Sequence, residues 1–250
     1  MALASKAKIL GIIPARWGST RFPGKPLHLI AGKPLVQHVW DRCQLCKNLD
    51  SVVVATDDQR IADAVEAFGG QVALTASDHP SGTDRIAEVA KQQADCTHVI
   101  NIQGDEPLIS PDLIDELAQT LIDQDDCEMV TAANPIRFED PEFNDPNVVK
   151  VVLDHHGRAL YFSRSPLPFP RSPIPDLQVL RHKGIYGFSR EFLLRFVKWP
   201  PSALERCEQL EQLRALENGA KINVIITSDD SPGIDTPEQA DILNRQFLTE

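Results

Sequence analysis

A glycine- and proline-rich loop near the start of the chain is the first segment whose residue types suggest chemistry. It reads ARWGSTRFPGKP from Ala15 to Pro26, and its three cations are Arg16, Arg21 and Lys25. Cations, hydroxyl donors and the open backbone beside glycine are the groups that bind polyphosphates. The loop is not a P-loop, because five residues instead of four follow Gly18 before the next Gly-Lys pair, and a proline replaces the hydroxyl residue after that pair. We therefore expect a polyphosphate site of another type, the alternative being an ordinary solvated basic face.

Charge is distributed unevenly along the chain. The formal net charge is −11, yet the first 40 residues hold six Lys or Arg and no Asp or Glu. The other 210 residues carry 19 basic and 36 acidic side chains, which gives them a net charge of −17. An acidic chain is a poor partner for nucleic acid, and one short cationic segment within it favours a small anionic ligand.

Two aspartates are candidates for a metal site. Asp105 directly follows an apolar run in the segment GDEP, and Asp235 precedes an expected helix in the segment GIDTP. Mg²⁺ is commonly held by one or two carboxylates together with substrate phosphates, so this sparse pair suits Mg²⁺. Two alternatives stay open from the sequence: Asp235 helps to cap the helix, and Asp105 is an ordinary turn residue. Glu106 is a weaker candidate.

The elements that position these residues alternate between strands and helices. Buried strands are expected at 8–15, 51–56, 72–75 and 97–102, and helices at 34–46, 57–69, 84–93 and from 110 onward. Such alternation predicts βαβ units and an α/β fold with a mainly parallel sheet and helices on both faces. Ligands of such sheets bind at the carboxyl ends of the strands, where both the first loop and Asp105 are expected to lie.

The alternation changes after residue 135. Further strands are expected at 148–153, 181–189 and 221–227, a helix at 204–218, and a last helix that begins with a capping-box pattern at Thr236. Residues 163–175 contain five prolines and are expected to form an ordered arm or a lid. We expect one α/β domain with three parts, which are a nucleotide-binding half (1–135), a smaller lobe (136–220) and a closing strand and helix (221–250).

Composition excludes several classes of protein. No run approaches the roughly 18 apolar residues of a membrane helix, and the apolar run at 9–13 is broken by Pro14, so we expect a cytoplasmic protein without membrane contact. Five cysteines, an odd number, argue against a disulfide framework. Cys43-x-x-Cys46 lies on the apolar stripe of an expected helix, and we interpret it as structural.

Seven segments resemble, in order, the motifs of the CMP-sugar-acid synthetase family. They are the loop at 15–26, SGTDR at 81–85, NIQGDEP at 101–107, YFSR at 161–164, HKGIYGF at 182–188, EQLEQLR at 208–214 and GIDTP at 233–237. The resemblance covers nearly the whole chain and is to members that activate the sugar acid 3-deoxy-manno-octulosonate (Kdo) for lipopolysaccharide biosynthesis. It implies a nucleotide-diphospho-sugar transferase-like, Rossmann-type fold whose smaller lobe serves sugar binding and dimerisation. It also implies an enzyme that joins CTP to Kdo and releases pyrophosphate.

The resemblance assigns the nucleotide to three regions. The residues implied in nucleotide binding are Arg16, Gly18, Ser19, Thr20, Arg21 and Lys25 of the first loop, with Thr83, Asp84, Arg85 and Gln103. Arg16, Arg21, Lys25, Asp105 and Asp235 are implied as catalytic, with the two aspartates as ligands of a Mg²⁺ cofactor. Cations at these positions suit the reaction, because negative charge develops on phosphoryl oxygens. As alternatives, Gln103 ties backbone segments together, and Thr83 or Asp84 only caps a helix.

The resemblance assigns the sugar acid to the second half of the chain. The implied residues are Arg164, Ser165, His182, Tyr186, Glu211 and Gln212. A sugar carboxylate needs a cation and its hydroxyls need mixed donors and acceptors, which this set supplies. The alternatives are a structural role for His182 and a place on the polar face of a helix for Glu211 and Gln212.

The proline-rich arm carries apolar residues without the periodicity of a helix or strand, namely Leu167, Phe169 and Ile174. Together with the resemblance this predicts a homodimer formed through the second half of the chain, the alternative being a lid over its own sheet. Two other functions remain open from the sequence. One is a cytidylyltransferase for another sugar acid such as sialate, and the other is a non-catalytic nucleotide-sensing protein, which has no need for paired aspartates.

Overall fold

The computed structural model describes residues 7–18, 22–124, 126–172 and 177–249. The chain forms two compact units, one made of Met1–Ala118 with Ser231–Glu250 and the other of Gln119–Asp230. The expected division into three parts at 135 and 220 stays a prediction; by compactness, the last helix belongs with the first unit and strand β11 (Ile222–Ile226) with the second.

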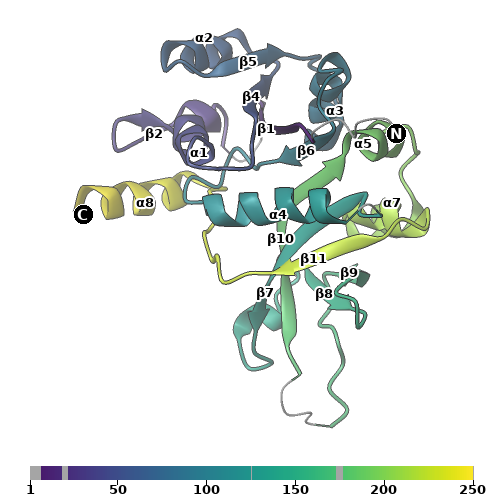
Figure 1. Cartoon of the computed structure of the whole chain (residues 1–250). Helices are drawn as coiled ribbons and strands as arrows, with labels where there is room; N and C mark the ends of the chain where they lie inside the picture. Colours follow the sequence, from purple (N-terminus) through teal and green to yellow (C-terminus); the bar gives the residue numbers. More distant parts are fainter. Residues whose placement is uncertain (1–6, 19–21, 125, 173–176, 250) are drawn as a thin grey trace. The chain divides into compact units, whose positions relative to one another are not determined.

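The first unit is built on a parallel sheet (Figure 1). Its strands are β1 (Ile9–Ala15), β4 (Ser51–Thr56), β5 (Gln71–Leu74) and β6 (His98–Asn101), in the order β6-β1-β4-β5. β1 is buried along nearly its whole length, as its run ILGIIPA predicts. β1 pairs with β4 on one side and with the later strand β6 on the other, so the order of strands reverses at β1. Open α/β sheets bind their ligands at such a reversal.

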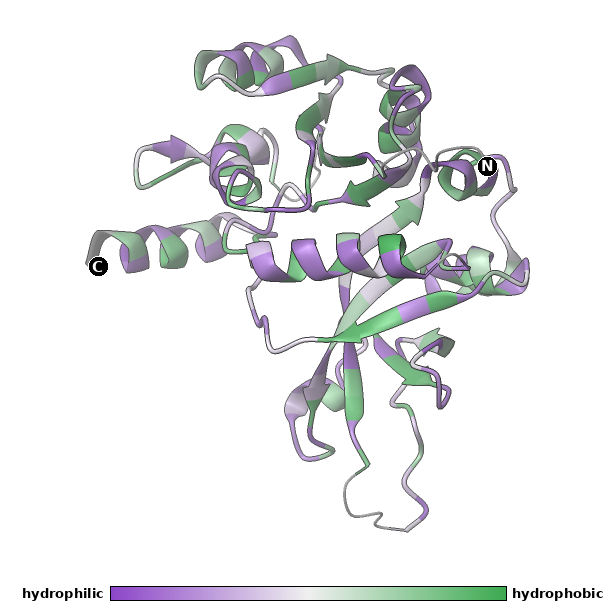
Figure 2. Ribbon diagram, viewed as in Figure 1, coloured by the Kyte–Doolittle hydropathy of each residue, from purple (hydrophilic) through white to green (hydrophobic). Residues whose placement is uncertain are grey.

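Three helices pack on these strands: α1 (Leu35–Cys43), α2 (Gln59–Ala67) and α3 (Gly82–Gln92). The unit also contains most of α4 (Pro111–Asp123), which continues into the second unit, and α8 (Pro237–Thr249). Figure 2 shows apolar and polar residues alternating along α4 and α8, whereas β1, β4 and β6 are mostly apolar. Asp58 caps α2 as expected, since its carboxylate accepts a hydrogen bond from the amide of Arg60 at 3.0 Å. Gly69 follows the helix with a φ of 84°, the left-handed geometry of a helix stop.

Two short elements follow the first loop. The 3₁₀ helix η1 (Lys25–Leu27) starts from Gly24 with a φ of 69°, and the hairpin β2 (Leu29–Ile30) and β3 (Lys33–Pro34) leads into α1. A small core beneath them contains Phe22, Ile30, Leu35, Ile234, Ala240 and Leu243. This core attaches the loop after β1 to the segment that leads into α8.

The second unit is built mainly from antiparallel pairs. β10 (Val179–Ser189) pairs with β7 (Met129–Ile136) and with β8 (Lys150–Leu153), and β8 pairs with β9 (Ala159–Ser163). β11 lies parallel to β7. The 3₁₀ helix η2 (Pro141–Phe143) follows β7, and α5 (Arg190–Phe196), α6 (Ala203–Glu208) and α7 (Gln212–Glu217) follow β10.

One expected helix was wrong in the second unit. Residues 204–218 form two short helices instead of one, because Gln209 adopts a φ of 54° that ends α6. α6 begins at Ala203, one residue earlier than expected, with a capping box between Ser202 and Glu205. Among the described residues, no helix is both long and apolar enough to cross a membrane.

Candidate functional site

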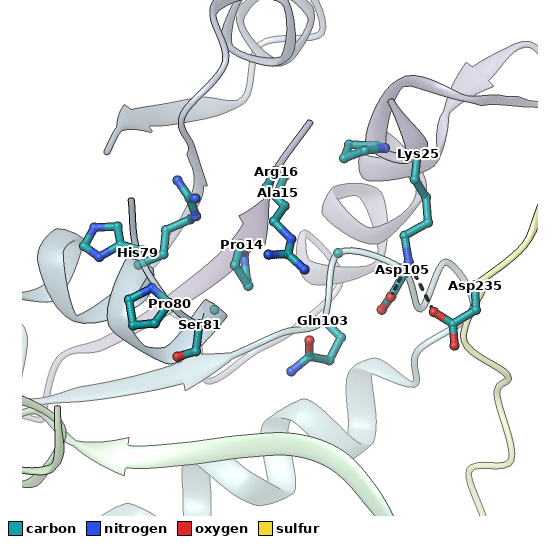
Figure 3. A pocket seen from close by; sticks show the side chains of 14 residues that line it. Pro14, Ala15, Arg16, Lys25, His79, Pro80, Ser81, Gln103, Asp105 and Asp235 are labelled. Atoms are coloured by element: carbon teal, nitrogen blue, oxygen red, sulfur yellow. Dashed lines mark hydrogen bonds and ion pairs between the residues drawn. The ribbon is translucent and has the colours of Figure 1, made fainter. Parts of the chain in front are cut away.

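A pocket of about 290 Å³ lies in the first unit at the reversal of strand order. It is lined by the end of β1 (14–16), the start of η1 (25–26), the segment 79–82 with Arg85, the turn 103–105 after β6, and Asp235. Figure 3 shows the labelled side chains around this space. Of the residues predicted from the sequence, the structure brings six of the described ones to the pocket, namely Arg16, Lys25, Arg85, Gln103, Asp105 and Asp235. Ser19, Thr20 and Arg21 lie outside the described residues.

The two ends of the first loop are held together at Trp17 and Gly24. The amide of Gly24 donates a hydrogen bond to the carbonyl of Trp17 at 3.1 Å. The Trp17 indole packs so closely on Gly24 that a Cβ there would lie 2.9 Å from the ring, and the guanidinium of Arg60 lies 3.4 Å from the centre of the ring on which it stacks. The sequence analysis did not single out Trp17 or Arg60. Trp17 and Arg60 both help to hold the two ends of the loop in place, and Gly18, the residue after Trp17, is exposed.

Lys25 connects the loop to the two predicted carboxylates. Its Nζ donates to Oδ2 of Asp105 at 2.7 Å and to the carbonyl of Ile234 at 2.9 Å, and lies 3.6 Å from Oδ1 of Asp235 (Figure 3). The Lys25 side chain is 15% exposed. Residues far apart in sequence thus meet at one ammonium group, as the sequence analysis expected for the two aspartates.

The two aspartates are held together by backbone as well. The amide of Ile234 donates to the carbonyl of Asp105 at 2.8 Å, and the Ile234 side chain is buried in the small core beneath η1. The capping box of α8 uses Thr236 and Gln239, whose side chains bond to each other's backbone amides at 3.1 and 3.4 Å. Capping of α8 therefore does not need the Asp235 carboxylate, which turns toward Lys25 (Figure 3).

Gly104 sets the position of the turn after β6. A Cβ at this residue would lie only 2.7 Å from the carbonyl oxygen of Pro14, so no larger residue fits without displacing the turn from β1. The close approach places Gln103 and Asp105 beside the end of β1. Gln103 lines the pocket with its amide, and that placement is compatible with contact to a base.

The predicted motif at 81–85 has a mixed role. The Ser81 hydroxyl caps α3 and bonds to the carboxylate of Asp84 at 2.7 Å, and Thr83 is buried away from the pocket. Arg85 lines the pocket but is 3% exposed, and its guanidinium bonds to Asp57 at 3.2 Å and to the carbonyl of Ala76 at 3.3 Å. Ser81 and Asp84 thus take part in the cap of α3, the nucleotide contacts implied for Thr83 and Asp84 stay predictions, and Arg85 lies in the wall of the pocket.

His79 and Glu88 were missed by the sequence analysis. His79 lines the pocket, and its Nε2 lies 2.5 Å from a Glu88 oxygen that also accepts from the amide of Ala76 at 3.0 Å. The hydrogen bond from His79 lowers the pKa of Glu88. Glu88 lies nine residues after His79, nearly two turns into α3. Helical periodicity does not predict this pair, because His79 lies in the loop before the helix.

The predicted sugar-binding residues lie in the second unit, and His182 and Tyr186 come together there. Their rings lie 5.5 Å apart on β10, and the His182 ring also packs edge-on against Phe162 at 4.9 Å. The Thr131 hydroxyl lies 2.7 Å from the carbonyl of Ile185 and 2.9 Å from Nε2 of His182. Because that hydroxyl has one hydrogen, which it donates to the carbonyl, Nε2–H of His182 is the donor to it and Nδ1 is left as an acceptor. Burial lowers the pKa of His182 to about 3, so the ring is neutral at ordinary pH.

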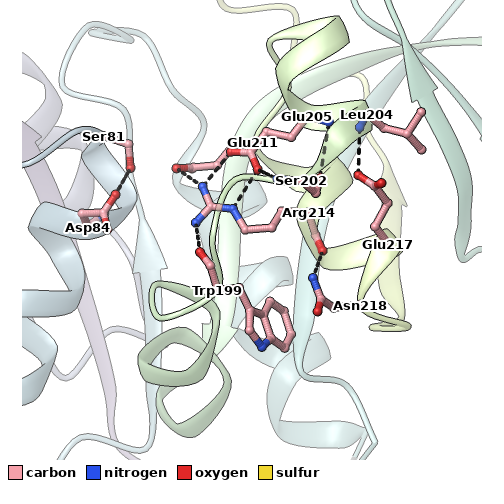
Figure 4. Close-up of polar contacts among 10 residues, drawn as sticks. All are labelled: Ser81, Asp84, Trp199, Ser202, Leu204, Glu205, Glu211, Arg214, Glu217 and Asn218. Carbon is pink, nitrogen blue, oxygen red and sulfur yellow. Dashed lines mark hydrogen bonds and ion pairs between the residues drawn. The ribbon is translucent and has the colours of Figure 1, made fainter.

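Glu211 and Gln212 lie at the start of α7, next to a buried ion pair. Arg214 bonds to Glu205 at 2.7 and 2.9 Å and lies 3.5 Å from Glu211 (Figure 4). Burial, and after it the charge of Glu211, raises the pKa of Tyr186, which places Glu211 near the His182 and Tyr186 pair. Gln212 is only 4% exposed, and its Nε2 has no hydrogen-bond partner within the described part of the chain. A buried amide in that state suits a ligand that accepts a hydrogen bond.

Arg164 and Ser165 are placed differently from the rest of this set. The Arg164 guanidinium bonds to the carbonyls of Glu208 at 2.7 Å and Pro146 at 3.0 Å, so it stabilises the end of α6. Ser165 is exposed, and its amide bonds to the hydroxyl of Ser163 at 3.0 Å. The fully buried Lys150, which the sequence analysis missed, donates to three carbonyls, one of them that of Arg164 at 2.8 Å.

The carboxylate pair fits a Mg²⁺ ion that shares its shell with a substrate. Asp105 and Asp235 converge within 2.7 and 3.6 Å of one cationic atom, so their oxygens already face a common point. Over the ranges that the structure describes, no group of three or more His, Cys, Asp or Glu forms a metal cage. Oxygens of substrate and water would therefore complete the shell, which is the usual mode for Mg²⁺ in phosphoryl transfer.

Cations, an amide side chain and two carboxylates at the carboxyl ends of neighbouring parallel strands define a nucleotide-binding site suited to transfer at a phosphate. The chain matches the family model described as cytidylyltransferase over residues 10–222, and it belongs to that family. This confirms the resemblance found in the sequence and the predicted α/β fold class.

Curated relatives and a solved structure show which members of the family this chain is similar to. The chain is 51% identical to the 3-deoxy-manno-octulosonate cytidylyltransferase of Solibacter usitatus, with 96% of this chain and 94% of that protein covered. It is 50% identical to the 8-amino-3,8-dideoxy-manno-octulosonate cytidylyltransferase of Shewanella halifaxensis, with 96% and 98% covered. A solved CMP:2-keto-3-deoxy-manno-octonic acid synthetase complexed with CTP shares 40% identity and superposes with a TM-score of 0.92 over 97% of this chain and 99% of that one.

Proposed function

We propose that this chain transfers CMP from CTP to Kdo and releases pyrophosphate. The observation that carries the proposal is the meeting of Lys25, Asp105 and Asp235 in a pocket at the reversal of strand order. The 40% identical synthetase was solved with CTP, and relatives at about 50% identity are named for Kdo. Family membership makes a non-catalytic nucleotide sensor the weaker alternative, and the relatives named for Kdo make a sialate enzyme weaker.

The chemistry requires neutralisation of charge at the triphosphate. In the proposed reaction, the anomeric hydroxyl of the sugar attacks the α-phosphorus and loses its proton to water. The bond between the α-phosphorus and the oxygen that bridges to the β-phosphorus breaks, and that oxygen leaves with pyrophosphate. Arg16 and Lys25 line the pocket and supply positive charge there, and Gln103 offers a donor and an acceptor to the base. We propose that Asp105 and Asp235 hold Mg²⁺, which when bound neutralises charge on the phosphates.

The second unit would hold the sugar acid. We propose that Tyr186, Glu211, Gln212 and neutral His182 contact its hydroxyls. His182 presents Nδ1 as an acceptor, and the Gln212 amide has a donor available among the described residues. Arg164 is committed to backbone carbonyls, so we place it in support of this region.

Turnover tests the proposal directly. Pyrophosphate release is measured with CTP, Mg²⁺ and a panel of sugar acids that contains Kdo, its 8-amino-8-deoxy analogue and sialate. We expect Kdo to be the best substrate. The 8-amino sugar is the second candidate, because a relative named for it is 50% identical, almost as similar as the relatives named for Kdo. If the protein binds CTP but releases pyrophosphate with none of the three sugars, the proposed enzymatic activity is refuted.

The carboxylates provide a second test. Asp105→Asn or Asp235→Asn should lower turnover by about a hundredfold or more at ordinary Mg²⁺ concentration, because each change removes one charge from the proposed ion shell. Asp41→Asn is the matched control, since that aspartate pairs with Lys33 on the surface of the same unit. Near-normal turnover in Asp235→Asn would show that its carboxylate has no part in metal binding.

We further propose a homodimer formed through the second unit, acting in the cytoplasm where CTP is made. The support is apolar exposure: Phe169 of the proline-rich arm is 81% exposed and Leu160 of β9 is 61% exposed, while Ile174 lies outside the described residues. Light scattering should give twice the chain mass of 27.7 kDa, and a double change of Leu167 and Phe169 to Asp should reduce it to one chain. A mass of one chain for the unmodified protein would favour the alternative that the proline-rich arm is a lid over its own sheet.

A further inference from the structure

The position of the Lys25 ammonium differs from that expected of a group reserved for phosphate. Two hydrogen bonds and one ion pair direct it to Asp105, the carbonyl of Ile234 and Asp235 (Figure 3). The side chain is 15% exposed, so most of its surface is covered by these partners and their surroundings. In this arrangement the lysine offsets one of the two negative charges of the carboxylate pair.

A divalent ion held by Asp105 and Asp235 would need the same carboxylates. Magnesium binds oxygen at about 2.0–2.1 Å. The ammonium already lies 2.7 Å from Oδ2 of Asp105 and 3.6 Å from Oδ1 of Asp235, so both cations would lie within a few ångströms of each other. Two carboxylates cannot balance three positive charges at that separation, and repulsion between the cations would be strong.

Entry of a triphosphate changes this balance. Its oxygens give the lysine new acceptors and give the metal additional ligands. The lysine backbone cannot follow, because η1 has Pro26 in its first turn and Phe22 just before it is buried in the small core. Only the flexible side chain can move, and four methylene groups allow it to swing from the carboxylates to a phosphate in the same pocket.

We propose that Lys25 is a placeholder cation for the metal. In the free protein it occupies the position between Asp105 and Asp235 and so weakens metal binding; when CTP arrives it moves onto the triphosphate and yields that position to the ion. Metal and nucleotide therefore bind together, and the free protein holds the metal poorly. This inference rests on the proposed metal site at the two aspartates.

The test measures metal binding by the free protein, with Mn²⁺ as the probe and electron paramagnetic resonance of unbound Mn²⁺ as the readout. Without nucleotide, Lys25→Met should bind Mn²⁺ at least tenfold more tightly than the unmodified protein. Lys25→Arg keeps the charge and should bind as weakly as the unmodified protein. Lys33→Met is the matched control, because Lys33 pairs with Asp41 outside the pocket, and it should change nothing. Adding Asp105→Asn to Lys25→Met should remove the gain.

Equal Mn²⁺ affinity in Lys25→Met and the unmodified protein would overturn the inference, as would tight binding in Lys25→Arg. Thermal unfolding checks that each variant is folded, and Lys25→Gln carries the same expectation as Lys25→Met where the latter does not fold. A separate arm adds CTP and follows water-proton relaxation by bound Mn²⁺. If Asp105→Asn in the otherwise unmodified protein leaves that signal unchanged, the proposed metal site itself is wrong, whatever Lys25 does.

Discussion

Replacing Gly104 by alanine tests whether the close approach of the turn after β6 to β1 positions the site. The new Cβ would lie 2.7 Å from the carbonyl oxygen of Pro14 and 3.4 Å from a methyl group of Ile13. The first contact involves backbone of a buried strand, which has little freedom to yield. Ordinary contact begins at 3.4 Å, so the turn has to move by about 0.7 Å, the difference between 3.4 and 2.7 Å.

That displacement sets the size of the expected effect. A misplacement of about 1 Å at a reacting centre costs up to a hundredfold in rate, so we expect turnover to fall about ten- to a hundredfold as Gln103 and Asp105 shift with the turn. Crowding of this kind also lowers the free energy of unfolding by about 1–3 kcal/mol. Pyrophosphate release measures the first effect and denaturant unfolding the second.

The matched control is Gly82→Ala, in the same pocket. A Cβ at Gly82 would lie 3.6 and 3.8 Å from the Pro14 ring, which is ordinary contact, and the residue starts α3, where alanine is favourable. We expect the turnover of Gly82→Ala to lie within about twofold of that of the unmodified protein, because the new methyl group makes only ordinary contacts and strains nothing. If Gly104→Ala is folded and as active as Gly82→Ala, the close approach to Pro14 does not position the site.

Two further predictions concern buried ionisable groups. Arg85→Met should lower the free energy of unfolding by about 3–5 kcal/mol, because it leaves Asp57 in a poorly solvated site without its ion-pair partner. Arg137→Ala breaks an exposed ion pair and should change the free energy of unfolding little, and urea unfolding of both variants measures the difference. His182 has a folded pKa of about 3 and an ordinary pKa of 6.5, so the unfolded chain takes up a proton that the folded chain refuses, and stability is full above pH 6.5 and falls as the pH drops toward 3. Between pH 7 and pH 5 the loss from this group should be about 1–2 kcal/mol; it should disappear in His182→Gln, and an equal slope in both proteins would contradict the assigned burial.

The sequence predicted most of the first unit because its signals are local. Apolar β-branched runs and capping residues such as Asp58 and Thr236 act within a few positions, and the helices and strands follow them. The break in the expected helix at 204–218 was missed for a local reason as well. Ser202 and Glu205 form a capping-box pattern that marks an earlier start, while the left-handed residue that ends α6 is Gln209, a type that carries no such signal.

The site was predictable only where residues follow a strand. Asp105 lies four residues beyond the end of β6, and Lys25 lies in the loop that follows β1, so topology brings both to one edge of the sheet. The contacts that fix their environment are not readable in this way. Arg85, which lines the same pocket, meets Asp57 only after the chain has folded, because the two residues share neither a helix face nor a strand register.

The cations near the start of the chain are of two kinds, those on the surface and those that line the pocket. Lys8 and Lys33 are about half exposed and pair with Asp95 and Asp41 on the surface, so they serve as ordinary solvated charges. Arg16 and Lys25 instead line the pocket, and Lys25 is only 15% exposed. An excess of charge in a sequence segment therefore indicates that an anion site is near, and the position of each side chain relative to the pocket decides which members form it: Arg16 is exposed there, whereas Lys25 is largely covered. A largely covered cation such as Lys25 needs an internal counter-charge whenever no anion is bound, and Asp105 and Asp235 provide it, so the proposed metal ligands and the proposed phosphate-binding cation lie within a few ångströms of each other.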